Sequence, residues 1–405
     1  MNKWFALTGL YLVQGLPHGF FGQAMPVLLR QQGLDLALIG MLSVVSLPWA
    51  LKFLWAPLLD RFALKRGEYR RSWILAMNYS AAAVLLLLAS QPLAVWTESG
   101  LFLPLGLLLL LNTLIATQDI ATDAMAVENI EPARRGLANG IQVAGYRSGM
   151  IIAGGLLVSL YGVIGWHWAL WLLAGLMVLG TLPLWLFKPR AHLVSREPLW
   201  PQWLGFFRLK DAGLWILLLL VYKLGDAFGT PMIRPLLSDA GVSLEQLGVL
   251  MGTTGFLAGL FGALLGGWLV TRLGRQATLL AFLLAEALAL LSYLGIDGMA
   301  GALQKDWLHI YLAVIVEHLA GGLGTAALFT VMMDRCRAHC EAGDYALQSC
   351  LVIISGMIAG SLSGFSARAL GYDGHFVVAA LLTLLPLVLV WALIKRRAFV
   401  LQRDF

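Results

Sequence analysis

The sequence predicts an all-α membrane protein with twelve transmembrane helices in two pseudo-symmetric six-helix halves. Three observations predict this fold class: an apolar composition, a succession of apolar stretches of bilayer length, and an internal repeat. Of the 405 residues, 60% are hydrophobic and only 12% are charged, whereas charged residues make up about a quarter of soluble globular domains. Mean hydropathy is +0.80. Lipid is therefore expected to surround most of the chain, and the spans leave no room for a soluble catalytic domain.

Twelve apolar stretches follow one another, each close to the roughly 20 residues that a spanning helix needs. The first six spans are expected at 4–29, 38–59, 72–89, 101–125, 137–161 and 166–187. The second six are expected at 212–236, 247–270, 277–294, 309–333, 345–370 and 374–394. The polar stretch between the two sets predicts an N-terminal bundle at 1–190, a cytoplasmic linker at 191–211 and a C-terminal bundle at 212–405. The first span lacks a small-residue cleavage site after it, so we expect it to be retained.

The orientation follows from the loops, because Lys and Arg accumulate on the cytoplasmic side of a membrane. Alternate loops carry clusters such as Arg70-Arg71 and Arg134-Arg135, whereas the opposite loops offer little beyond Arg30 and Lys305. Both termini are therefore expected in the cytoplasm. The net charge of +6 is explained by this bias and requires no nucleic-acid partner.

Two pieces of the first half recur in the second half at nearly one offset. Leucines and glycines at 28–40 recur at 236–248, a shift of 208, and Ser148-Gly-Met-Ile recurs from Ser355, a shift of 207. The repeat indicates duplication of a six-helix unit, and since six is even, both halves have the same orientation in the membrane.

Small residues recur at a spacing of four in two corresponding spans. The fifth span carries Gly145 and Gly149, and the eleventh carries Gly356, Gly360 and Gly364. This spacing places the glycines of each span on one helical face, where another backbone can approach closely. We expect tight helix packing there, which is compatible with a sliding surface.

Ionisable residues inside spans are costly and mark functional sites by default. The fourth span carries Asp119 and Asp123 on one face, and the fifth carries Arg147 at a similar depth. We expect an ion pair between Asp119 and Arg147, which would be either a structural lock or part of the substrate site. An acid that alternates between a cation and a proton can couple transport to a proton gradient, so Asp119 and Asp123 are the predicted proton acceptors.

The second half offers its own charged groups. Lys223 and Asp226 in the seventh span are three residues apart and can neutralise each other. Glu317 and His318 in the tenth span are neighbours, so we expect them to point in different directions, with only one facing the cavity. Because histidine side chains in general titrate near physiological pH, His318 is a candidate proton relay. Glu286 in the ninth span has no evident partner.

The first span combines polar residues with a proline that either bends the helix toward a cavity or serves only its packing. The predicted substrate cavity is lined by polar groups of the first, fifth, seventh and tenth spans, namely Gln14, His18, Gln23, Arg147, Lys223, Asp226, Glu317 and His318.

Sequence motifs of enzymes are absent. The chain contains no Gly-x-Ser-x-Gly, no His-Glu-x-x-His and no phosphate-binding loop, since lysine never follows glycine. We therefore expect neither enzymatic activity nor a cofactor. Cys336, Cys340 and Cys350 are expected to be reduced thiols, and with His339 the first two supply only three metal ligands, so no metal site is predicted.

Four strings resemble one known family. They are Gln14-Gly-Leu-Pro17, the fifteen residues from Leu47 to Arg61 with Lys-Phe-Leu-Trp-Ala-Pro-Leu-Leu-Asp-Arg at their end, Thr117-Gln-Asp-Ile-Ala-Thr-Asp123 and Gly145-Tyr-Arg-Ser-Gly149. Together they resemble the AmpG-type branch of the major facilitator superfamily, also called the peptide and acetyl-coenzyme A transporter family. The resemblance is strong in the first half and weak in the second. It implies the major facilitator fold and a monomeric secondary transporter, embedded in the lipid of the bacterial inner membrane, that works by alternating access.

Within that branch, the compact length and the opening at 14–26 are more similar to siderophore permeases of the RhtX/FptX type, because permeases resembling AmpG carry two additional spans. This similarity implies import of an iron-loaded siderophore, coupled to protons. The alternative is permeation of anhydromuropeptides or another bulky amphipathic solute, and a membrane-embedded enzyme is the remote alternative.

The resemblance also implies a cytoplasmic gate. Asp60 and Arg61 occupy the loop motif that in major facilitators helps latch the cytoplasmic ends of helices. The counterpart in the second half contains Arg272, with Thr271 at the position where an acid is expected. One latch is therefore expected to be weaker than the other.

Overall fold

The computed structural model describes residues 2–25, 29, 42–65, 68–92, 102–187, 199–299 and 306–396. Over these ranges the regular elements are helices and no strand occurs, in agreement with the predicted all-α class. The chain forms two compact units. Unit 1 comprises Met1–Ile130, Ala144–Trp203 and Cys336–Cys350, and unit 2 comprises Glu131–Val143, Leu204–Arg335 and Leu351–Phe405. Each unit thus includes one short segment from the other half of the sequence.

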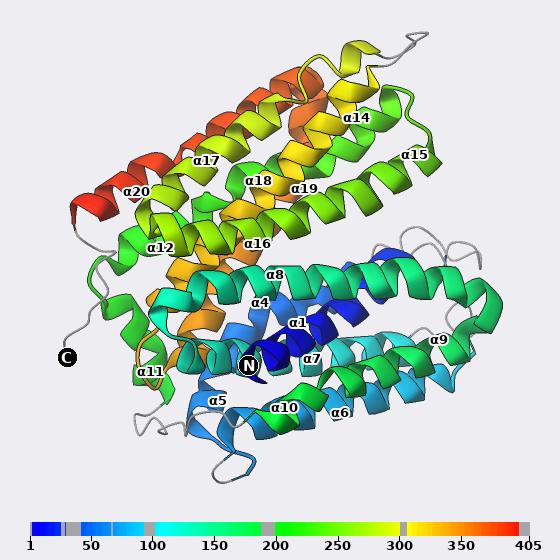
Figure 1. Cartoon of the computed structure of the whole chain (residues 1–405), viewed down its shortest axis with the longest axis vertical. Helices are drawn as coiled ribbons and strands as arrows, with labels where there is room; N and C mark the ends of the chain where they lie inside the picture. Colours follow the sequence, from blue (N-terminus) through cyan, green and yellow to red (C-terminus); the bar gives the residue numbers. More distant parts are fainter. Residues whose placement is uncertain are drawn as a thin grey trace. The chain divides into compact units, whose positions relative to one another are not determined.

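The helices of the first half are drawn in blue to green in Figure 1. They are α1 (Asn2–Gly19), η1 (Phe20–Ala24), η2 (Leu42–Ser46), α4 (Leu47–Leu51), η3 (Lys52–Leu54), α5 (Ala56–Arg61), α6 (Tyr69–Ala89), α7 (Phe102–Asn129), η5 (Pro132–Arg134), α8 (Arg135–Ile151), η6 (Ile152–Leu157), α9 (Val158–Gly180), α10 (Leu182–Leu186) and α11 (Leu199–Gly205).

The second half continues in green to red. Its helices are η7 (Phe206–Arg208), α12 (Ala212–Tyr222), α13 (Leu224–Gly229), η8 (Thr230–Met232), α14 (Ile233–Asp239), α15 (Leu244–Val249), η9 (Leu250–Gly255), α16 (Phe256–Leu273), α17 (Arg275–Leu291), η10 (Asp297–Met299), α18 (Trp307–Asp334), α19 (Glu341–Leu384) and α20 (Pro386–Lys395).

Seven helical runs in the described ranges are long and apolar enough to cross a membrane. They are Tyr69–Ala89, Phe102–Asn129, Leu160–Leu186, Ala212–Asp239, Glu245–Leu273, Trp307–Asp334 and Glu341–Lys395. The last run holds the predicted eleventh and twelfth spans, divided at Gly371, whose φ of 71° is open to glycine and disfavoured for other residues. The count of twelve and the cytoplasmic placement of the termini stay predictions, and most of the repeat copy at 28–40 lies outside the described residues.

Each unit has its own apolar core. In unit 1, α6 packs against α7 and α9, and in unit 2, α16 and α17 pack against α18 (Figure 1). Leu85 and Leu173 are fully buried in the first core, as are Ile310 and Phe376 in the second. Large apolar side chains such as Leu288 also cover the outer surface, as expected for helices that face lipid rather than water.

Close backbone contact joins α1 to α8 in unit 1. A methyl group added to Gly149 would overlap the Leu12 carbonyl oxygen, and one added to Gly15 would overlap the Tyr146 carbonyl oxygen. The prediction of a close approach in the fifth span is therefore confirmed at Gly149. The two helix axes can approach this closely because neither backbone carries a side chain at the crossing.

The eleventh span is packed differently. A methyl group on Gly356 would stand 3.5 Å from the Ala227 Cβ atom, one on Gly360 would stand 3.6 Å from the Ala227 carbonyl oxygen, and one on Gly364 would have no neighbour within 4 Å. These are ordinary contacts or open space. The prediction of an equally close approach in the eleventh span is therefore wrong, since its glycines face a looser surface in the described part of unit 2.

We predict that Gly149→Ala lowers the melting temperature of the purified protein, because the added methyl group must displace the α1 backbone. Overpacking of this kind costs about 1–3 kcal/mol. Gly364→Ala is the matched control, and it should leave the melting temperature unchanged. Equal melting temperatures for the two variants would contradict the α1–α8 contact.

Candidate functional site

A buried ion pair lies in unit 1 between the short helix η3 and the long helix α7. The Lys52 ammonium contacts the Asp119 carboxylate, and the two side chains are only 3% and 7% exposed. We expected Arg147 as the partner of Asp119, and the structure corrects this expectation. The segment after α4 turns into a 3₁₀ helix at Lys52, which places the lysine beside α7, while Arg147 lies half-buried on α8.

Hydrogen bonds of neighbouring residues on α7 join this helix to the first span. The Gln14 amide donates to Gln118 at 3.0 Å, the Gln118 amide donates to Thr122 at 3.1 Å, and the Tyr11 hydroxyl donates to Asp123 at 3.0 Å. Asp119 and Asp123 lie one turn apart on α7, where Asp119 contacts the Lys52 ammonium and Asp123 accepts from the Tyr11 hydroxyl.

The end of the first span is irregular. Helix α1 continues past Pro17 to Gly19 and then widens into the π-helical turn η1, a deviation frequently found at functional sites. His18 is exposed on this helix, and its ring centroid lies 5.8 Å from that of Tyr146. The side chain of Gln23 lies outside the described residues.

In unit 2 one lysine contacts two carboxylates. The Lys223 Nζ atom lies 2.8 Å from Asp226 and 2.6 Å from Glu286. The predicted i, i+3 pair is therefore present, and Glu286, which had no partner evident from the sequence, shares the same lysine. Glu286 is 2% exposed and packs against Gly324 of α18, where a methyl group would overlap its carboxylate.

The side chains of Glu317 and His318 in the tenth span lie closer together than expected. Thr230 donates to one oxygen of Glu317 at 2.9 Å, and the other oxygen lies 2.5 Å from the His318 Nδ1 atom. The expectation that Glu317 and His318 point apart is wrong, because the imidazole turns back along α18 toward the Val314 carbonyl, 3.0 Å away. His318 lines a pocket of about 460 Å³, and Glu317 is not among the residues that line it.

The first predicted gate residue, Asp60, is fully buried. Its carboxylate lies 2.6 Å from Arg70 and accepts from the backbone N–H groups of Ala342 and Gly343 at 3.1 and 2.8 Å. These N–H groups belong to the first turn of α19, which favours an anion. Arg70 also lies 2.7 Å from Glu128. We call these five residues the Asp60 cluster.

Arg61, predicted with Asp60 as a residue of this gate, has a different environment. Its guanidinium lies 5.7 Å from the Phe62 ring centroid, and its carbonyl accepts from the Tyr69 hydroxyl at 3.4 Å. The cation of Asp60 is Arg70 instead. Because Asp60 lies on α5 and Arg70 lies in the first turn of α6, the intervening loop allows the two helices to bring these charges together.

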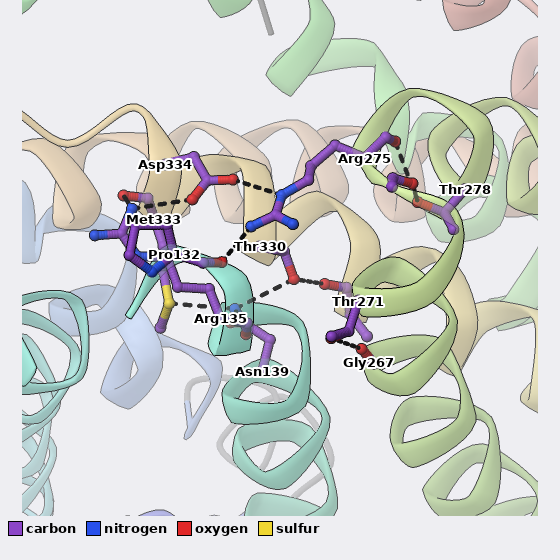
Figure 2. A network of polar contacts seen from close by, with 12 residues as sticks. Pro132, Arg135, Asn139, Gly267, Thr271, Arg275, Thr278, Thr330, Met333 and Asp334 are labelled. Atoms are coloured by element: carbon purple, nitrogen blue, oxygen red, sulfur yellow. Dashed lines mark hydrogen bonds and ion pairs between the residues drawn. The ribbon is translucent and has the colours of Figure 1, made fainter. Parts of the chain in front are cut away.

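The counterpart in unit 2 is the Asp334 cluster, shown in Figure 2. The Asp334 carboxylate accepts from Arg275 at 2.9 Å and from Arg135 at 3.0 Å, and the Arg275 guanidinium also donates to the Pro132 carbonyl. The acid that the sequence lacks at Thr271 is thus supplied by the last residue of α18. The Thr271 hydroxyl donates to its own helix instead.

The gate residue predicted in the second half of the sequence, Arg272, has a different environment. Arg272 is exposed, with its guanidinium 5.7 Å from the Trp268 ring centroid, whereas Arg275 holds Asp334. Charged residues that flank spans at the same end, such as Arg275 at the start of α17 and Asp334 at the end of α18, were the signal that sequence reasoning missed.

No group of three or more metal-binding side chains occurs within the described ranges. Cys336, Cys340 and Cys350 form no disulfide with one another.

Comparison with known proteins identifies close relatives. The family model of the major facilitator superfamily matches residues 7–252 and 215–404. The chain is 31% identical to the anhydromuropeptide permease of Escherichia coli strain K12, over 94% of this chain and 78% of that protein. It is 25% identical to a putative transporter named AmpG 4 from Rickettsia conorii, over 94% of both chains.

Solved structures agree at the level of the fold. A bacterial homologue of the iron transporter ferroportin, in an outward-facing state, has a TM-score of 0.72 and 14% identity, and it covers 98% of this chain and 100% of that one. A human organic anion transporter has a TM-score of 0.70 and 14% identity, covering 96% and 98%. At these identities the likeness shows a shared fold alone.

We predict that Arg275→Gln lowers the melting temperature, because the buried Asp334 carboxylate loses one of its two cationic donors. Leaving such a group short of a partner costs about 1–3 kcal/mol. Arg272→Gln removes the same charge three residues earlier, near the end of α16, where the guanidinium is exposed, and should have no effect on the melting temperature. An equal loss in both variants would show that Arg275 stabilises the protein only through its charge.

Proposed function

This chain belongs to the AmpG-like branch of the major facilitator superfamily, and on that premise we propose that it imports an anhydromuropeptide across the bacterial inner membrane. The observation that carries the proposal is the 31% identity to the anhydromuropeptide permease of E. coli over 94% of this chain. The chain is a multi-pass membrane transporter by family. Its substrate, and the direction in which the substrate moves, are the proposed part.

The comparisons favour this substrate over the iron-loaded siderophore that the opening of the sequence resembles. None of the relatives reported above is named as a siderophore permease, and the ferroportin homologue is only 14% identical. An anhydromuropeptide is an amino sugar joined to a short peptide, so it presents amides, hydroxyls and carboxylates together with apolar surface.

The polar groups in the spans support a solute of this chemistry. Unit 1 buries Lys52, Asp119 and Gln14 at the level of its membrane helices, and unit 2 places Asp226 and His318 at a pocket. Charged side chains inside membrane spans are rare and commonly mark a solute pathway. Enzymatic activity, the remote alternative, has no comparable support, since the relatives are named as permeases and transporters.

We further propose proton coupling through α7. Asp119 has one cationic partner, Lys52, and both are buried, so a proton on Asp119 would release Lys52 to an anionic group of the solute. Asp123, one turn away, accepts from Tyr11 and is the second candidate acid. Exchange of Lys52 between an acid of the protein and an acid of the solute would link proton binding to solute binding.

We predict that cells lacking their own anhydromuropeptide uptake accumulate radiolabelled N-acetylglucosaminyl-anhydromuramyl tripeptide several-fold above vector-only cells when they produce this protein. Accumulation of a radiolabelled iron-loaded siderophore should stay at the vector level. The opposite pattern would reject the muropeptide proposal and restore the siderophore interpretation.

We predict that Asp119→Asn abolishes accumulation driven by the proton gradient but preserves exchange of labelled for unlabelled solute across loaded vesicles. The amide cannot take up the coupled proton, whereas exchange requires no net proton movement. Asp123→Asn, one turn away, is the matched comparison, and the amount of folded protein is checked for both. Unchanged gradient-driven accumulation in Asp119→Asn would refute its role as the proton site.

A further inference from the structure

The pocket of unit 2 lies where the seventh span is interrupted. Helix α12 ends before Lys223, whose φ of −103° and ψ of 10° leave the helical region, and a second irregularity follows at η8, which contains Pro231. The seventh span runs from α12 to α14, whose labels stand at opposite ends of unit 2 in Figure 1. Discontinuous membrane helices commonly form solute sites, because their interrupted backbone needs a polar cavity to face.

The opposite wall of the pocket is also irregular. The π-helical turn η9 supplies Met251 and leads into Phe256 of α16. Its last residue, Gly255, lets the His318 ring approach the backbone, since an added methyl group would stand 2.7 Å from the His318 Nε2 atom. The imidazole is thus held at the pocket wall by a glycine that no larger residue could replace without moving it.

The charged side chains around the pocket differ in whether they contact another charged group of unit 2. Asp226 lies 2.8 Å from Lys223, and His318 lies 2.5 Å from Glu317, so both are engaged with other groups of unit 2. Arg234 also lines the pocket and is exposed, and the described residues give its guanidinium no ion pair or hydrogen bond. The charge that remains available to a solute is therefore positive.

The other lining residues are apolar or small. Ala227, Pro231, Met251 and Phe256 form this part of the wall, and Thr230 adds a hydroxyl. A guanidinium beside an apolar wall fits a carboxylate attached to an aliphatic group, because the planar fork of arginine donates two parallel hydrogen bonds to a carboxylate.

We propose that this pocket is a subsite for a carboxylate of the solute's peptide, bound by Arg234, with the aliphatic peptide carbons against Met251 and Phe256. The proposal rests on the proposed function, since an anhydromuropeptide is the solute that brings such a peptide. A siderophore can also carry a carboxylate, so the experiment includes both sources. Arg234 is a specificity-determining residue in this arrangement, and the sugar lies outside the subsite.

The test compares two ligands on the purified full-length protein in neutral detergent. One is N-acetylglucosaminyl-anhydromuramyl tripeptide with free peptide carboxylates, and the other is the same molecule with every carboxylate converted to a primary amide. Wild-type protein should bind the free acid about tenfold or more tightly than the amide, the difference expected for one strong charged hydrogen bond. Arg234→Gln should bind both ligands with the affinity that wild-type protein has for the amide.

Two further variants make the result specific. Arg234→Lys keeps the charge and should recover part of the preference for the free acid. Arg368→Gln removes another exposed arginine, about one turn before Tyr372, whose hydroxyl contacts Asp239 at the end of α14, and it should bind like wild type. The melting temperatures of the variants without ligand show that each is folded.

The outcomes separate the two proposals. If wild-type protein binds neither muropeptide but binds a carboxylate-bearing iron siderophore through Arg234, the proposed function fails and the carboxylate subsite stands. If wild-type protein binds both muropeptide forms equally, or if Arg234→Gln keeps the preference for the free acid, the subsite is overturned while muropeptide transport stands. An effect of Arg234→Gln seen only in vesicles with phosphatidylglycerol, and not with phosphatidylcholine alone, would assign Arg234 to lipid headgroups and also overturn the subsite.

Discussion

Neutralisation of buried charge by a lysine is the interaction on which the polar interior of both units depends. In unit 1, Lys52 contacts Asp119, and in unit 2, Lys223 contacts Asp226 and Glu286. An isolated ion in a low-dielectric interior is expensive, whereas a paired and hydrogen-bonded ion is tolerated. The two arrangements differ in the number of acidic partners, because Lys223 contacts two carboxylates and Lys52 contacts one.

Both lysines lie at positions where the regular α-helix is interrupted. Lys52 begins the 3₁₀ helix η3 after α4, and Lys223 stands between α12 and α13. A regular helix would carry its side chains around the axis at a fixed angle, whereas a break re-aims one side chain and frees backbone groups. The π-helical turns η1 and η9 also interrupt regular helix, η1 directly after His18 and η9 beside the His318 ring. The irregular segments therefore coincide with the polar groups from which we build the proposed solute and proton sites.

The Asp60 cluster of unit 1 and the Asp334 cluster of unit 2, both at helix ends, show a second use of paired charge. The Asp60 cluster ties α5 and α6 to the first turn of α19, and the Asp334 cluster ties η5 and α8 to α17 and α18. In each cluster, segments from both halves of the sequence meet within one compact unit. A contact of this kind must break whenever those segments separate.

Local periodicity was enough to predict the all-helical class, several of the apolar spans, the i, i+3 contact of Lys223 with Asp226, and the close approach at Gly149. Which distant charges meet depends instead on how the helices pack. Asp119 lies 67 residues from Lys52, and Arg275 lies 59 residues from Asp334. Arg147 and Arg272 were equally acceptable partners by charge. Coulomb attraction favours any opposite charge, and only the packing of the helices selects the one within reach.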